Sequence, residues 1–95
     1  MSGAEAERPT PAPNTVFARL GDHGAVVYDH ARSKAILLDA TGAEIWQQLD
    51  GQSTAAEIVS TLAPHFAADA TTIAADVNAL LDELVASGFL ADVVL

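Results

Sequence analysis

The spacing of apolar residues changes once along this chain, from every second residue to every third or fourth, and the change falls just after Leu38. Before that point, short β-branched and aromatic stretches alternate with turn residues, which is typical of β-strands. After it, apolar residues recur at helical spacing. A chain of 95 residues with one such change is expected to form a single α+β domain, with a sheet first and helices second.

Three strands are predicted before the change, at residues 15–20, 25–29 and 34–38. The residues between them, 21–24 and 30–33, are of the types that favour turns. Because both connections are short, neighbouring strands are expected to pair in an antiparallel meander.

The first 14 residues hold three of the four prolines and show no apolar periodicity. Such a composition does not bury enough apolar surface to order a segment. We therefore expect residues 1–14 to form a disordered tail that precedes a folded domain of residues 15–95.

Three helices are predicted after the change, at about residues 41–49, 54–63 and 69–87. Gly51 and Gly88 are expected to end the first and the third, since glycine readily adopts the left-handed conformation found past a helix end. Thr54 and Glu57 fit a capping box at the start of the second helix, which kinks or ends before Pro64. This order is that of a winged helix-turn-helix-like fold.

Each helix carries an apolar face that is expected to form the core. The residues on these faces are Ile45, Trp46 and Leu49, then Ile58, Val59 and Leu62, then Ile73, Val77, Leu80, Leu81 and Leu84. A large aromatic such as Trp46 beside two aliphatic residues is typical of a core anchor.

The charge of the chain limits its partners. The net charge is −9, and all four Lys and Arg residues precede residue 35, so the helical part carries only acids. A surface without cations cannot neutralise the phosphates of a nucleic acid and is repelled by an anionic membrane. Cysteine is absent, and no signal peptide or membrane span is evident. We expect a cytoplasmic protein that binds neither nucleic acid nor membrane.

No catalytic or metal site is predicted. The three histidines, His23, His30 and His65, lack the spacing of metal ligands, and the glycines form no phosphate-binding loop. No nucleophile motif surrounds any Ser or Thr. The chain is therefore expected to have no enzymatic activity and no cofactor.

A binding surface is predicted at the edge of the sheet. The third strand ends the meander, so one of its sides exposes unpaired backbone groups to which an extended peptide can add as a further strand. A proline at Ile36 is expected to remove a donor from this edge and to abolish binding. On the third helix, Asp76, Leu80 and Glu83 share one flank. Leu80 would contact apolar side chains of a guest and the acids would attract its basic residues. The alternative remains that Leu80 is core and the acids are solvated.

Several short sequence elements follow one another along the chain in a characteristic order. They are Leu38-Asp39, Thr41-Gly42-Ala43, Ile45-Trp46, Asp50-Gly51, Thr54 with Ile58-Val59, Asp76-Val77 and Gly88-Phe89-Leu90. Taken in this order, over about residues 16–90, they resemble the PqqD family of small peptide-binding domains, the precursor-peptide recognition elements.

The resemblance implies a non-catalytic adaptor that binds the leader segment of a ribosomally synthesised precursor peptide. The adaptor then delivers the peptide to a modifying enzyme, which is a leader protease, a cyclase or a radical S-adenosylmethionine enzyme. The resemblance places the leader antiparallel along the third strand and against the third helix. The leader-binding residues are then Lys34, Ala35, Ile36, Leu37, Leu38, Asp76, Leu80 and Glu83.

Two family members of this size are similar to the chain, the recognition protein of lasso-peptide pathways and the peptide chaperone of pyrroloquinoline quinone synthesis. The resemblance favours the lasso pathway, although Asp39 stands where asparagine is common and Ala35-Ile36 where lasso proteins often have an aromatic residue. An alternative from another class is a winged-helix-like regulatory module that associates with proteins and binds no leader. The oligomeric state is left open.

Overall fold

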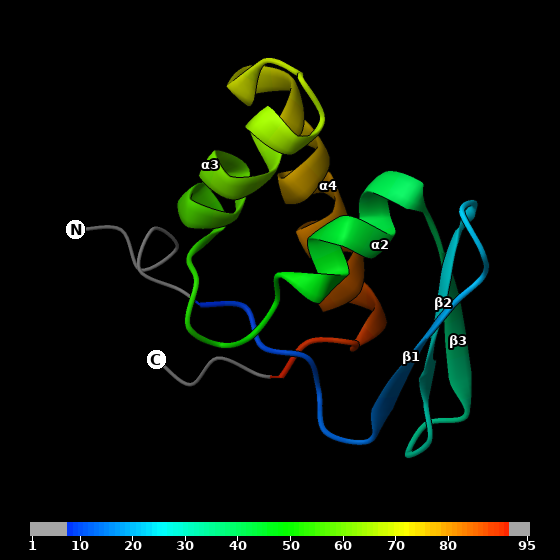
Figure 1. Cartoon of the computed structure of the whole chain (residues 1–95). Coiled ribbons are helices and arrows are strands. Elements are labelled where there is room, and N and C mark those ends of the chain that lie inside the picture. Colours follow the sequence, from blue (N-terminus) through cyan, green and yellow to red (C-terminus); the bar gives the residue numbers. More distant parts are fainter. Residues whose placement is uncertain (1–7, 92–95) are drawn as a thin grey trace.

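The computed structural model describes residues 8–91, which form a sheet followed by helices (Figure 1). The elements are β1 (Thr15–Arg19), β2 (Gly24–Asp29), β3 (Lys34–Asp39), α2 (Ala40–Gln47), α3 (Ala55–His65) and α4 (Ala70–Ser87). The three helices lie on one side of the sheet (Figure 1). The α+β fold expected from the change in apolar spacing is confirmed.

The sheet is the predicted antiparallel meander, with strand order β1-β2-β3. Alternate residues face the helices, so Val27 is fully buried, whereas its neighbour Tyr28 points to the open face and is exposed. Gly24 opens β2 with a φ of +146°, and a Cβ there would lie 2.0 Å from the carbonyl oxygen of Leu38. Only glycine allows β2 and β3 to approach so closely at this end.

Helix α2 starts directly after β3 and is shorter than predicted. Its N-cap is Asp39, and it ends at Gln47 instead of Leu49. Gln48 and Leu49 donate to the carbonyl groups three residues earlier, both at 3.0 Å, which tightens the last turn and closes the helix. Gly51, with a φ of +76°, therefore shapes the following loop and does not stop the helix as expected.

The start of α3 follows the sequence signals, whereas its end does not. The capping box is confirmed, because the Thr54 hydroxyl accepts from the Glu57 N–H at 3.2 Å and the Glu57 carboxylate accepts from the Thr54 N–H at 2.8 Å. Pro64 lies inside the last turn, so the helix does not end before it as expected and continues to His65. A proline in the last turn removes one bond to the preceding turn and leaves the residues after it free to remain helical.

Helix α4 is the longest element, with 18 residues. Asp69 occupies the N-cap position as predicted, but its side chain makes no capping hydrogen bond. Gly88 ends the helix in the left-handed conformation, with a φ of +81°, and the Phe89 N–H donates to the Leu84 carbonyl at 2.9 Å. The predicted glycine stop is confirmed at this end.

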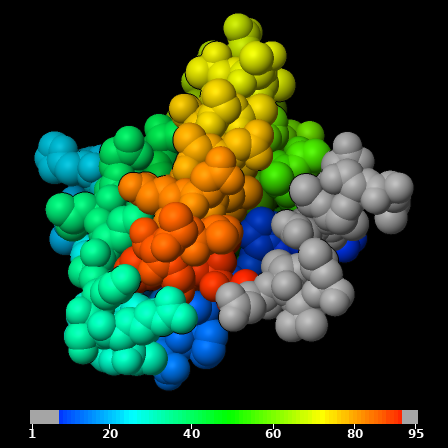
Figure 2. Space-filling model, turned by 180° about the vertical axis from the view of Figure 1, so that it is seen from behind, coloured from blue at the N-terminus to red at the C-terminus, as the bar shows by residue number. Residues whose placement is uncertain are grey.

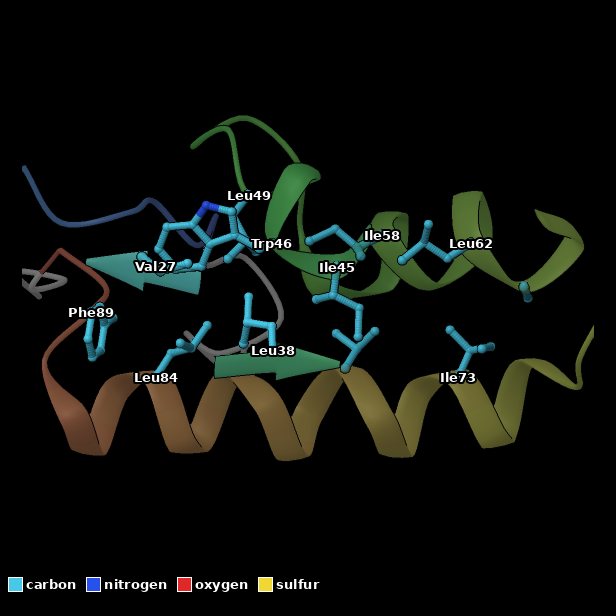
Figure 3. Close-up of a cluster of buried hydrophobic side chains, with 12 residues drawn as sticks. Val27, Leu38, Ile45, Trp46, Leu49, Ile58, Leu62, Ile73, Leu84 and Phe89 are labelled. Atoms are coloured by element: carbon cyan, nitrogen blue, oxygen red, sulfur yellow. The ribbon is translucent and has the colours of Figure 1, made fainter. Parts of the chain in front are cut away.

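The core lies between the sheet and the three helices, and Figure 3 shows its side chains meeting above α4. Trp46 is only 6% exposed, which confirms its role as a core anchor. Val77 and Leu84 of α4 are fully buried, whereas Leu80 and Leu81 are half-buried and pack against the same cluster.

Within the described part of the expected tail, residues 10–12 pair with residues 89–91, and the Pro9 carbonyl accepts from the Gly51 N–H at 3.2 Å. Pro11 and Leu90 form an isolated antiparallel bridge. Around it, the Ala12 N–H donates to the Phe89 carbonyl at 2.9 Å and the Ala91 N–H donates to the Thr10 carbonyl at 2.8 Å. Such backbone bonds need no apolar periodicity in the segment that makes them. Residues 1–7, and with them that part of the expected tail, lie outside the described residues, and the domain boundary at residue 15 stays a prediction.

Candidate functional site

A groove of about 240 Å³ opens between the free edge of β3, the start of α2 and the outer flank of α4. Figure 2 shows the face of the molecule that α4 crosses. The residues lining the groove are Leu37, Leu38, Asp39, Thr41, Gly42, Ile45, Asp76, Ala79, Leu80 and Glu83.

The hydrogen-bond pattern of the sheet decides which backbone groups reach this groove. The His30 N–H donates to the Asn14 carbonyl at 2.9 Å and the Leu20 N–H donates to the Gly24 carbonyl at 2.8 Å. The backbone N–H and C=O groups of even-numbered residues of β2 therefore point toward β1, and those of odd-numbered residues point toward β3. Val27, which is opposite Ile36, consequently bonds to it.

The same alternation applies along β3. Lys34, Ile36 and Leu38 direct their N–H and C=O groups to β2, whereas Ala35 and Leu37 direct theirs to the free edge. No strand of the described residues covers that edge. The expectation that Ile36 supplies an edge donor is therefore wrong. Its N–H belongs to the ladder inside the sheet, and the edge donors are those of the two residues beside it.

The α4 wall of the groove combines one apolar and two acidic side chains. Leu80 is half-buried, packs against the core and lines the groove, so it belongs to both. Asp76 and Glu83 are exposed on either side of it. Ile45 of α2, only 1% exposed, forms part of the floor.

The charge of the groove is entirely negative among the described residues. Asp39, Asp76 and Glu83 line it, and no Lys or Arg does. Two arginines are engaged elsewhere, because Arg19 pairs with Glu44 at 2.7 Å and Arg32 donates to the Gly88 carbonyl at 3.2 Å. The groove thus presents carboxylates around an apolar centre.

Of the eight residues expected at the site, five line the groove: Leu37, Leu38, Asp76, Leu80 and Glu83. The other three are on β3 but outside the groove lining. Lys34 is exposed at the far end of the strand, Ile36 packs against the core, and Ala35 offers only its backbone at the edge.

Five lining residues were not expected at the site: Asp39, Thr41, Gly42, Ile45 and Ala79. Four of them come from the end of β3 and the first turns of α2. The sequence does carry a signal for them, since an edge strand that runs directly into a helix must bring that helix to the edge. Ala79 lies one turn from Asp76, on the same flank of α4.

Two further observations describe what the residues 8–91 contain. They include no group of three or more His, Cys, Asp or Glu side chains placed to hold a metal ion. They also include no helix with the length and apolar character needed to cross a bilayer.

Comparison with known proteins places the chain in a family. The family model described as coenzyme PQQ synthesis protein D (PqqD) matches residues 24–90. This chain belongs to the PqqD family. A PqqA binding protein of Rhodopseudomonas palustris (strain HaA2) is 35% identical over 78 residues, which cover 74% of this chain and 76% of that protein.

Two solved structures share the fold of this chain. TbiB1 in complex with the TbiA(beta) leader peptide matches with a TM-score of 0.76, 24% identity, and coverage of 90% of this chain and 98% of that one. Lasso peptide synthetase B1 complexed with the leader peptide matches with a TM-score of 0.75 at the same identity, covering 90% and 99%. At this identity, the two structures establish the arrangement of strands and helices.

Proposed function

We propose that this chain binds the leader segment of a ribosomally synthesised precursor peptide, which adds to β3 as a fourth strand. The observation that carries the proposal is that Ala35 and Leu37 direct their backbone groups to the free edge of β3, beside a groove walled by α4. The curated relative is named for binding PqqA, and both solved neighbours hold leader peptides. These names support the same kind of ligand for this chain.

Strand addition explains how one small domain binds a peptide of defined sequence. Two edge residues, Ala35 and Leu37, offer up to four backbone hydrogen bonds, which any extended peptide satisfies. Selection among peptides then depends on side chains that enter the groove, where Leu80 and Ile45 provide apolar contact.

The groove suits binding better than chemistry, because its lining consists of apolar side chains, Thr41 and carboxylates. We therefore propose a non-catalytic adaptor that presents the leader to a maturation enzyme, either a leader protease, a cyclase or a radical S-adenosylmethionine enzyme. The adaptor acts in the cytoplasm, where ribosomal precursors are made.

A titration followed by NMR amide shifts tests peptide binding. The ligand is the precursor peptide encoded beside the gene of this chain, and the control is a peptide of the same composition in scrambled order. We expect shifts concentrated on residues 34–39 and 76–83, with the Ala35 and Leu37 amides among the largest. Equal, scattered shifts with both peptides would contradict strand addition.

The adaptor role needs a separate measurement. We compare the rate of precursor conversion with and without this chain. The enzyme used is a maturation enzyme encoded beside the gene of this chain. We expect the chain to raise the rate for the intact precursor and to have no effect on a precursor without its leader. If the rate for the intact precursor is the same with and without this chain, the chain binds the peptide but has no delivery role.

A further inference from the structure

The position of β3 determines which guest side chains enter the groove. Residues directly opposite each other in an antiparallel pair share a face of the sheet. Ile36 and Leu38 are on the helix-facing side of β3, so the guest residues opposite them also point toward α4. Alternate guest residues, about 7 Å apart, therefore enter the groove.

The α4 wall has a matching order of side chains. Asp76 is followed by Leu80 one turn later and by Glu83 almost one turn after that. The rise along the axis is about 6 Å for the first step and about 4.5 Å for the second. The wall therefore reads acid, apolar, acid at a spacing that long guest side chains can follow from alternate positions.

The carboxylates on the α4 wall have no cationic side chain beside them among the described lining residues, so basic side chains of a bound guest can neutralise them. Among residues 8–91, no Lys or Arg lines the groove, and the carboxylate of Asp39 already accepts the Gly42 N–H at 2.7 Å. Arg19 and Arg32 bond to groups outside the groove. The carboxylates of Asp76 and Glu83 are exposed beside the apolar contact that Leu80 offers.

We propose that the groove selects an extended peptide whose alternate residues are basic, apolar and basic. The apolar residue packs on Leu80, and the flanking Lys or Arg side chains pair with Asp76 and Glu83. The proposal rests on the proposed strand addition and adds the side-chain chemistry of the guest. Charge-assisted pairing next to an apolar contact favours such a segment over one with neutral or acidic residues at the same positions.

Three synthetic peptides test the charge preference. The first is acetyl-Thr-Lys-Val-Leu-Val-Lys-Thr-amide, and the other two carry Gln or Glu in place of both Lys residues. Affinities are measured by NMR titration, which detects weak binding, in dilute buffer and at about 0.5 M salt, where charges are screened within a few ångströms. We expect the Lys peptide to bind about ten times more tightly than the Gln peptide, the Glu peptide to bind most weakly, and salt to reduce the differences.

Variants of the wall assign the preference to its residues. The double substitution Asp76→Asn with Glu83→Gln is expected to bring the Lys and Gln peptides to the same affinity. The matched control is Asp82→Asn, because Asp82 is an exposed carboxylate of the same helix that does not line the groove. It is expected to keep the preference of the unmodified chain.

Equal affinities for the Lys and Gln peptides, no shift with any of the three, or a preference that survives the double substitution would each overturn the proposal. A titration with the natural precursor tests the proposed function independently of the synthetic peptides. If the precursor binds at β3 while the synthetic peptides show no charge order, strand addition stands and the charge selection falls. If the charge order appears and no encoded precursor binds, the charge selection stands and the proposed binding of a leader peptide falls.

Discussion

The carboxylate of Asp39 accepts a hydrogen bond from the backbone N–H of Gly42 at 2.7 Å, and this bond joins the last residue of β3 to the first turn of α2. The two elements therefore meet without a loop, and their junction forms one corner of the groove. Gly42 fits closely there, since a Cβ would lie 3.2 Å from the Asp39 carboxylate and 3.3 Å from Cβ of Leu38.

Removing this cap should destabilise the fold. Asp39→Ala leaves the Gly42 N–H without its side-chain acceptor and is expected to cost about 1 kcal/mol of the free energy of unfolding. Asp39→Asn, which caps a helix about as well as aspartate, is the control and should lose much less. Urea unfolding of the three proteins measures the difference. Equal stabilities would mean that the bond contributes nothing in solution.

The double role of Leu80 predicts a separation between stability and binding. Leu80→Ala and Leu81→Ala remove the same atoms from half-buried positions on one helix, so each should cost about 1–2 kcal/mol, less than for fully buried leucines. Only Leu80 lines the groove. We expect precursor affinity to fall about five- to tenfold for Leu80→Ala and to stay unchanged for Leu81→Ala, as measured by calorimetric titration. Equal losses of affinity would place the peptide elsewhere.

The hydrogen-bond pattern of β3 predicts opposite effects of proline at adjacent positions. Ala35→Pro removes an N–H that points to the free edge, which edge strands tolerate, so the fold should survive and precursor affinity should fall about five- to tenfold. Ile36→Pro removes a ladder bond to β2 and should destabilise the domain itself. Circular dichroism melts and peptide titration distinguish the two. A stable Ile36→Pro protein would show that the pattern is reversed.

The capping box makes stability depend on pH. Two interactions with Thr54 lower the pKa of the Glu57 carboxyl from its ordinary value of 4.5. The hydrogen bond from the Thr54 N–H has the larger effect, and the Thr54 hydroxyl has the smaller one. A carboxylate whose pKa is lower in the folded state stabilises the fold above its unfolded pKa, and this contribution is lost as the pH falls through the folded pKa.

Glu57→Gln tests this dependence, because glutamine can accept the same bond and does not titrate. The wild-type chain should lose stability relative to the variant as the pH falls below about 4.5, and the difference between the two should be constant near neutrality. Urea unfolding between neutral and acidic pH measures it. Asp50, whose pKa is also lowered by the N–H groups of Gln52 and Ser53, is present in both proteins, so its effect cancels. A difference that does not change with pH would contradict the prediction.

The sequence by itself determined the elements and their order. The change in apolar spacing, the Thr54 capping box and the Gly88 stop each act within a few residues, so their effects can be predicted locally. The end of α2 was misplaced because Gly51 is also needed by the loop, and a glycine looks the same in both roles. The order of β3 and α4, together with the acids on one helix flank, also pointed to half of the residues that line the groove.

Only the tertiary structure decided which groups face the groove. Whether Ile36 or Ala35 directs its N–H to the free edge depends on how β2 pairs with both neighbouring strands. A shift of one residue in either pairing would reverse the answer. The half-burial of Leu80 depends on how α4 packs against α2 and α3. The pairing of residues 10–12 with 89–91 joins chain ends that no local pattern relates. Short-range signals specify helices and strands because their causes are local, whereas a binding surface is made by contacts between residues far apart in the chain.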